Sequence, residues 1–226
     1  MPALIIILFI VAIIFLPQWW AKKTFEQYAH TQDHIPGTGG ELARHILDAN
    51  NMKHVEVEIT EDGDHYDPSA KVVRLSANNF NDNSLTAVAV AAHEVGHAIQ
   101  DHNNETKLAL RTLLVITGQR FSKFNAVIMM IMPIVLLLTK SPMAILLFIL
   151  AGLVSIAGST LIHLVTLPVE WDASFGKALP ILKNHYIQEE DIPVIEKILK
   201  AAALTYVATS LMSIINVWRW LALFKR

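Results

Sequence analysis

The sequence contains no cysteine and carries little charge. Without cysteine the chain can form no disulfide, no thiol nucleophile and no thiolate metal ligand. Charged residues make up only 17% of the 226 positions, compared with about 25% in an ordinary soluble domain. The 18 basic and 20 acidic residues leave a formal charge of -2, so there is no basic surface of the kind that binds nucleic acid. We therefore exclude thiol chemistry and expect no nucleic-acid partner.

The sequence contains several long apolar runs. Residues 3–20 form an apolar run that is followed by two lysines, which predicts an N-terminal anchor whose C-terminal flank lies in the cytoplasm. Residues 121–167 predict a transmembrane hairpin, and residues 201–224 predict a fourth transmembrane or an interfacial helix. The sequence thus predicts a mainly α integral membrane protein with three to four transmembrane helices, multi-pass in the cell membrane, with the lipid bilayer as a partner.

Two polar segments lie between the apolar runs, and we assign the whole chain, 1–226, to a single domain. Residues 24–104 predict a soluble, zincin-like helical part. Within this part, alternating residues 54–60 and a second short strand at 71–76 predict a small β-hairpin. Residues 168–200 predict a second polar part that returns to the first.

The motif that carries chemistry is His-Glu-Val-Gly-His at residues 93–97, on a predicted alanine-rich helix. A spacing of four residues places His93 and His97 on one helical face, where both imidazoles can bind one zinc ion per chain. Glu94 is then positioned as the general base for a zinc-activated water. Composition alone would give this motif about 0.02 times in such a chain. The motif predicts a zinc-dependent endopeptidase that acts on a peptide or protein substrate.

A catalytic zinc site usually has three protein ligands, so the motif needs a third one. The metzincin pattern is excluded, because Gln100 and Asn103 stand where that pattern requires glycine and histidine. Glu170, an isolated acid at the end of an apolar run, is the best candidate, although an acid at a helix start is also an ordinary capping feature. Asp172 is either a rival ligand or a hydrogen-bond partner behind the ligands.

Three further features have both a functional and a structural interpretation. His163, two turns before Glu170, either approaches the metal or is hydrogen-bonded inside a helix bundle. Tyr206 is either a donor to the oxyanion of the reaction or an interfacial anchor. The strand 71–76 either pairs with an extended substrate or only packs on the helix of the motif.

Six segments of the chain occur together in this order: 38–50, 65–68, 71–76, 90–100, 167–174 and 203–208. With these segments the chain resembles the YugP-type membrane zinc metallopeptidases, a bacterial family of neutral zinc metallopeptidases, over nearly its whole length. This resemblance implies a membrane-bound glutamate-zincin with His93 and His97 as ligands, Glu94 as the base and Glu170 as the third ligand. A more distant likeness links the chain to the HtpX-type and prenyl-CAAX proteases, which have an aspartate where this chain has Ser174.

Two other classes of function compete with the peptidase. A catalytically idle zinc-binding membrane scaffold or adaptor would need the metal ligands but no general base, so the intact Glu94 favours the enzyme. A transporter would carry more ionisable side chains inside its spans. If the anchor and the hairpin both cross the membrane, the two polar parts lie on the same side, and the active site faces the cytoplasm.

Overall fold

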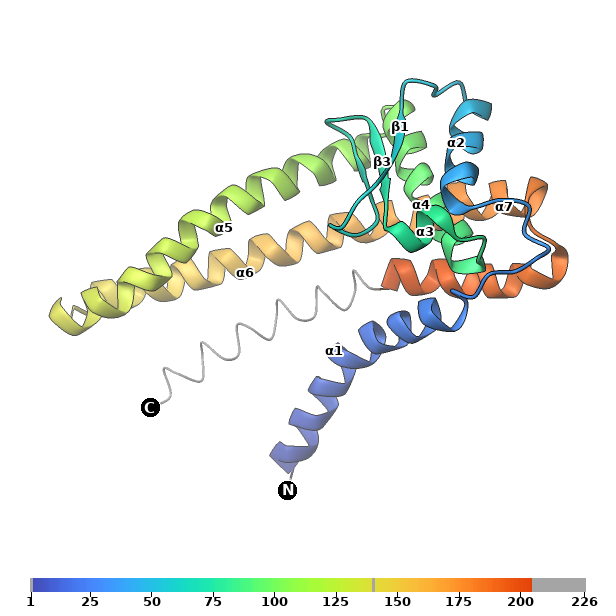
Figure 1. Ribbon diagram of the computed structural model, residues 1–226. Coiled ribbons are helices and arrows are strands. Elements are labelled where there is room, and N and C mark those ends of the chain that lie inside the picture. The colour runs from blue at the N-terminus through green and yellow to red at the C-terminus, as the bar shows by residue number, and fades with distance from the viewer. Residues whose placement is uncertain (1, 140, 205–226) are drawn as a thin grey trace.

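The structure is a computed structural model, and it describes residues 2–139 and 141–204 (Figure 1). A body of short helices and a small sheet is attached to three long helices. The helices are α1 (Pro2–Gln27), α2 (Gly39–Ala49), α3 (Ala77–Asn81), α4 (Leu85–His102), α5 (Thr106–Thr139), α6 (Pro142–Trp171) and α7 (Leu179–His185); between α6 and α7 lies the π-helix η1 (Asp172–Ala178), and after α7 come the 3-10 helix η2 (Glu189–Asp191) and a helical segment at 192–204.

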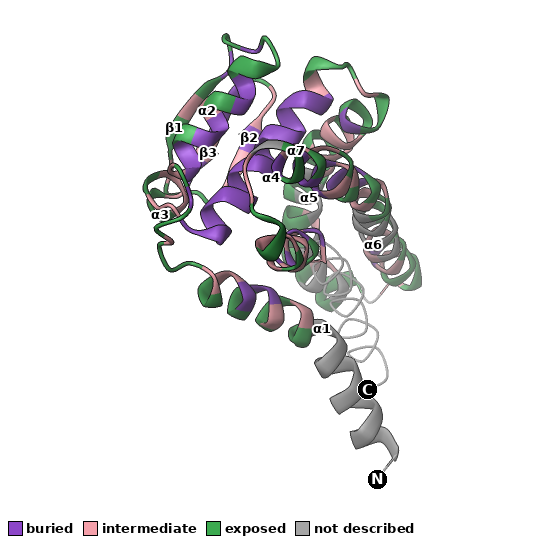
Figure 2. Cartoon of the chain, turned by 90° about the vertical axis from the view of Figure 1, so that its right-hand side faces the viewer, coloured by how far each residue is buried: buried purple, intermediate pink, exposed green. Residues whose placement is uncertain are grey.

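Helix α4 lies at the centre of the body. Every residue from Leu85 to Gln100 is buried, as the purple helix in Figure 2 shows. The helix begins where the side chain of Ser84 accepts a hydrogen bond from the backbone N–H of Ala87, which satisfies one donor of the first turn. Its many alanines let α2 and η1 approach closely, and the resulting core continues into α7 and the segment 192–204. The predicted alanine-rich helix is therefore present and enclosed by its neighbours.

The small sheet has the strand order β1-β3-β2, formed by β1 (Glu56–Ile59), β2 (His65–Asp67) and β3 (Val72–Leu75). Strand β3 is central, because it pairs with β1 in parallel and with β2 in antiparallel orientation. The prediction that residues 54–60 and 71–76 form a hairpin with each other is therefore wrong. The chain reverses after β2, where the Asp67 carboxylate accepts hydrogen bonds from the next backbone N–H groups.

This topology also affects the proposed pairing of residues 71–76 with a substrate. Both edges of β3 are occupied by its neighbours, so this strand offers no free edge for β-augmentation. It packs on α4 instead, and its Val73 and Leu75 side chains are fully buried.

Helices α5 and α6 run side by side away from the body (Figure 1). The prediction of three to four transmembrane helices is contradicted: across residues 2–139 and 141–204, no helix combines the length and the apolar character needed to cross a membrane. The helices that contain these runs also include charged residues nearer their ends, such as Lys22, Arg111 and Glu170. The cytoplasmic orientation inferred from those crossings loses this support. The predicted helix 201–224 lies mostly outside the described residues.

At Gly96, α4 lies close to the π-helix η1 that follows α6. A Cβ atom added to Gly96 would lie 2.7 Å from the backbone carbonyl oxygen of Ala173. Real Cβ atoms do not come this close to an oxygen, so any side chain here would force the two elements apart. Gly96 therefore sets how near α4 can lie to the end of α6.

We predict that Gly96→Ala lowers the free energy of unfolding by about 1–3 kcal/mol, the usual cost of overpacking a core. Chemical denaturation of the purified variant measures this change. Gly158→Ala is the matched control, because a Cβ there meets nothing within 4 Å and alanine is the better helix former. Equal stability of the two variants would contradict the close approach.

Candidate metal centre

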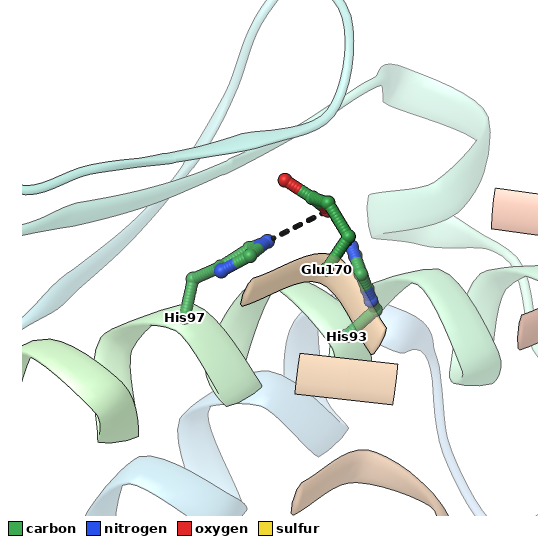
Figure 3. A group of neighbouring side chains, drawn as sticks. All are labelled: His93, His97 and Glu170. Carbon is green, nitrogen blue, oxygen red and sulfur yellow. Dashed lines mark hydrogen bonds and ion pairs between the residues drawn. The ribbon is translucent and has the colours of Figure 1, made fainter. Parts of the chain in front are cut away.

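The candidate metal centre joins the middle of α4 to the last turn of α6. His93 and His97 come from α4 and Glu170 from α6, and all three side chains are buried. The Nε2 atoms of both histidines lie 3.2 Å from the same oxygen, Glu170 Oε2, and Figure 3 shows the carboxylate between the two rings. One potential ligand atom from each residue lies within 4.8 Å of the others. The structure thus brings together the three residues predicted as zinc ligands; zinc binding itself stays a prediction.

A hydrogen-bond chain orients His97. The side-chain NH₂ group of Gln100 donates to Val169 O at 3.0 Å and to Asp172 Oδ2 at 2.8 Å. Two acceptors on that side mean that Gln100 Oε1 faces His97 Nδ1, 2.9 Å away. An amide oxygen only accepts, so His97 Nδ1 must carry the proton. Asp172 therefore contacts Gln100, which in turn contacts His97; whether Asp172 is a ligand or a partner behind the ligands stays a prediction.

His93 is held in the same way by a hydroxyl group. Ser174 Oγ lies 3.0 Å from His93 Nδ1 and donates to Leu199 O at 3.5 Å. With its hydrogen directed to that carbonyl, the hydroxyl oxygen accepts a hydrogen bond from Nδ1–H. Ser174 thus contacts His93 as Gln100 contacts His97.

The donor set fits a zinc ion. With Nδ1 of each ring engaged in these hydrogen bonds, Nε2 of each ring faces the carboxylate, where it either carries a second proton or binds a metal ion. Lone pairs that face one another at 3.2 Å repel, so a cation, either a proton or a metal ion, belongs between them. Two imidazole nitrogens and one carboxylate are a common protein ligand set of catalytic zinc.

The pKa values of two carboxylates in the centre are shifted in opposite directions. For Glu170, burial acts to raise the pKa, but the neighbouring His97 and His93 outweigh it and the pKa is lowered. For Glu94, burial dominates and raises the pKa to about 7. Glu170 is therefore held as an anion, whereas Glu94 is poised near neutral pH, as a group that takes and releases protons must be.

A cavity of about 160 Å³ lies beside Glu94 and His93. Asp64 is the other ionisable residue at its wall; its carboxylate accepts hydrogen bonds from Ser76 and Asn79 and so holds the start of α3. The remaining lining residues are apolar: Phe25, Ala89, Val90, Ile198, Leu199 and Ala202. The general base predicted from the motif therefore faces space that water or part of a substrate could occupy.

Sequence reasoning missed Arg111, which α5 brings to the opposite side of Glu170. Its Nη2 atom lies 3.0 Å from Glu170 Oε1. No sequence pattern connects residues 59 positions apart on different helices; the one available signal was a cation on an otherwise mildly amphipathic segment. Gln100, three residues after His97, was considered only as a departure from the metzincin pattern.

Two other predicted residues have no described role here. Tyr206 lies outside the described residues. His163 is in α6, but its side chain is not among those described, so its approach to the metal stays a prediction.

Comparison with known proteins agrees with this geometry. The sequence pattern of the family described as "Putative neutral zinc metallopeptidase" matches residues 3–225. The "Putative membrane protease YugP" of Bacillus subtilis (strain 168) is 35% identical, over 93% of this chain and 91% of that protein. No solved structure matches the chain. The match over nearly the whole chain shows that the protein belongs to the neutral zinc metallopeptidase family to which that description refers.

Proposed function

We propose that the protein is a zinc-dependent endopeptidase, with one zinc per chain held by His93, His97 and Glu170. The observation that carries this proposal is the convergence of two imidazole nitrogens on one oxygen of a fully buried carboxylate. Family membership supports zinc and peptidase chemistry. The substrate, a peptide or protein, is part of the same proposal.

Zinc bound in this place would polarise the scissile carbonyl and make water more acidic. Glu94 is next to His93 in sequence and lies at the wall of the cavity. Its carboxylate accepts a proton from the attacking water and then delivers that proton to the nitrogen of the departing amine. A pKa of about 7 suits both transfers. Gln100 and Ser174 keep the two imidazoles in the tautomer that leaves Nε2 free to bind metal.

The alternative is a catalytically idle zinc-binding scaffold. Such a protein would gain nothing from a buried carboxylate at Glu94, which burial makes costly to keep ionised. The general base at the cavity favours the enzyme.

We also propose that the protein associates with a lipid bilayer. Its relative is named as a membrane protease, and α5 and α6 expose large apolar side chains; Phe124, Met130 and Leu138 are 65%, 72% and 77% exposed. A surface of this kind marks an interaction site. That the site faces the cytoplasm stays a prediction, based on Lys22 and Lys23.

For the general base, we predict that Glu94→Gln keeps the zinc and lowers kcat at least about 100-fold, the contribution of a positioned base. Metal analysis beside a peptide-cleavage assay measures both quantities. The exposed Glu61 provides the matched control, since Glu61→Gln should leave both unchanged. Full activity in Glu94→Gln would overturn the role of the base, and a folded wild-type protein that binds no zinc would overturn the site.

For the third ligand, we predict that Glu170→Ala weakens zinc binding more than Asp172→Ala does. Loss of Asp172 removes one acceptor from Gln100, which typically costs about 10–100-fold in metal affinity, whereas loss of Glu170 removes a ligand. Competition with a chelator gives the two affinities. The reverse order would move the ligand assignment to Asp172.

For the bilayer, we predict that replacing Phe124, Met130 and Leu138 together by serine weakens binding to phosphatidylglycerol-containing vesicles more than tenfold, because each buried apolar side chain contributes about 1.5 kcal/mol or more. Vesicle flotation measures the binding. The control is Ile59→Ser, which removes an exposed apolar side chain from β1 in the body. Equal flotation of all three proteins would refute the proposed surface.

A further inference from the structure

Arg111 and the two histidines contact different oxygens of the Glu170 carboxylate. Both imidazoles face Oε2, and Arg111 Nη2 faces Oε1 at 3.0 Å. The side chain of Arg111 is 22% exposed and that of Glu170 is 0% exposed. One oxygen of the carboxylate is thus directed at the candidate metal position, and the other is directed at a cation from a different helix.

The contact between Arg111 and Glu170 is electrostatic. Among the described residues, Glu170 Oε1 is buried without a hydrogen-bond partner, and so is Arg111 Nε. The 3.0 Å approach of Nη2 therefore pairs the charges without hydrogen-bond geometry. A guanidinium is always charged. Removing one partner of a buried ion pair strongly destabilises the protein, because the other charge stays buried without a partner. Oε1 has no other described partner that could take the place of Arg111.

We propose that Arg111 is a positioning residue that holds Glu170 Oε1, so that Oε2 alone is offered to the metal. A catalytic zinc keeps three protein ligands and one open position. If both oxygens of Glu170 turned toward the ion, the carboxylate would occupy the place that water and substrate need. Arg111 prevents this by attracting the second oxygen to the other side. The inference rests on the zinc site of the proposed function.

Positioning by Arg111 and simple charge repulsion have opposite effects on zinc affinity. A fixed cation near a zinc site repels the ion, so its removal would tighten binding if charge alone mattered. Removal of a group that orients a ligand weakens binding, typically by about 10–100-fold. The sign of the change in affinity therefore distinguishes the two roles.

The test compares Arg111→Met, Arg111→Lys and the wild type in the full-length protein. Arg111→Met should weaken Zn²⁺ binding about 10–100-fold in chelator competition, and Arg111→Lys, which keeps the charge, should recover part of this loss. With Co²⁺ as the probe, the visible absorption of Arg111→Met should change from a four-coordinate toward a five-coordinate spectrum. The matched control is Arg120→Met, on the same helix but exposed, which should bind both metals like the wild type.

Unchanged or tighter Zn²⁺ binding in Arg111→Met would overturn the inference, and so would an Arg111→Lys variant that binds no better than Arg111→Met. If Arg111→Met does not fold, Arg111→Gln replaces it as the uncharged variant and should bind Zn²⁺ more weakly than Arg111→Lys. The readouts separate this inference from the proposed function. A wild type that binds zinc but cleaves no peptide refutes the peptidase and leaves the role of Arg111 standing.

Discussion

The burial of Glu170 is the constraint on which the arrangement of the site depends. A carboxylate removed from water is several kcal/mol less stable as an anion unless cations or donors surround it. Here the Nε2 atoms of two imidazoles contact one carboxylate oxygen, and the guanidinium of Arg111 contacts the other. These partners come from two other helices, so α4, α5 and α6 have to meet at this point. Glu170 thereby links the end of α6 to α4 of the body and to the start of α5.

A second set of contacts keeps the histidines from turning. The π-helix η1 follows directly after α6, and π-helical turns are frequent at functional sites. Asp172 and Ser174 at its start reach different partners, Gln100 and His93. Because Gln100 also bonds to the backbone of Val169, the position of Glu170 and the orientation of His97 depend on each other. A displacement of α6 would therefore disturb both halves of the centre.

The sequence predicted what is encoded locally. His93, Glu94 and His97 follow from the four-residue period of one helix, and Glu170 follows from being an isolated acid after an apolar run. Arg111 could not be predicted, because its role depends on how α5 lies against α6. The hairpin prediction was wrong because three residues, His65–Asp67, form an antiparallel partner for β3 and leave β1 to pair in parallel. The transmembrane prediction rested on apolar runs and is contradicted, because no helix of the described residues combines the length and the apolar character needed to cross a membrane.

The hairpin of α5 and α6 explains how residues so far apart in sequence reach one centre. The chain leaves the body through the start of α5, where Arg111 lies, and returns through the end of α6, where Glu170 lies (Figure 1). The two helices pack on each other along their length. Arg111 and Glu170 therefore lie side by side at the ends of these helices that are nearest to the body. Helix α4 is buried from Leu85 to Gln100, so its neighbours enclose it. The geometry of the metal centre therefore depends on the packing of α5 against α6, well outside residues 93–97.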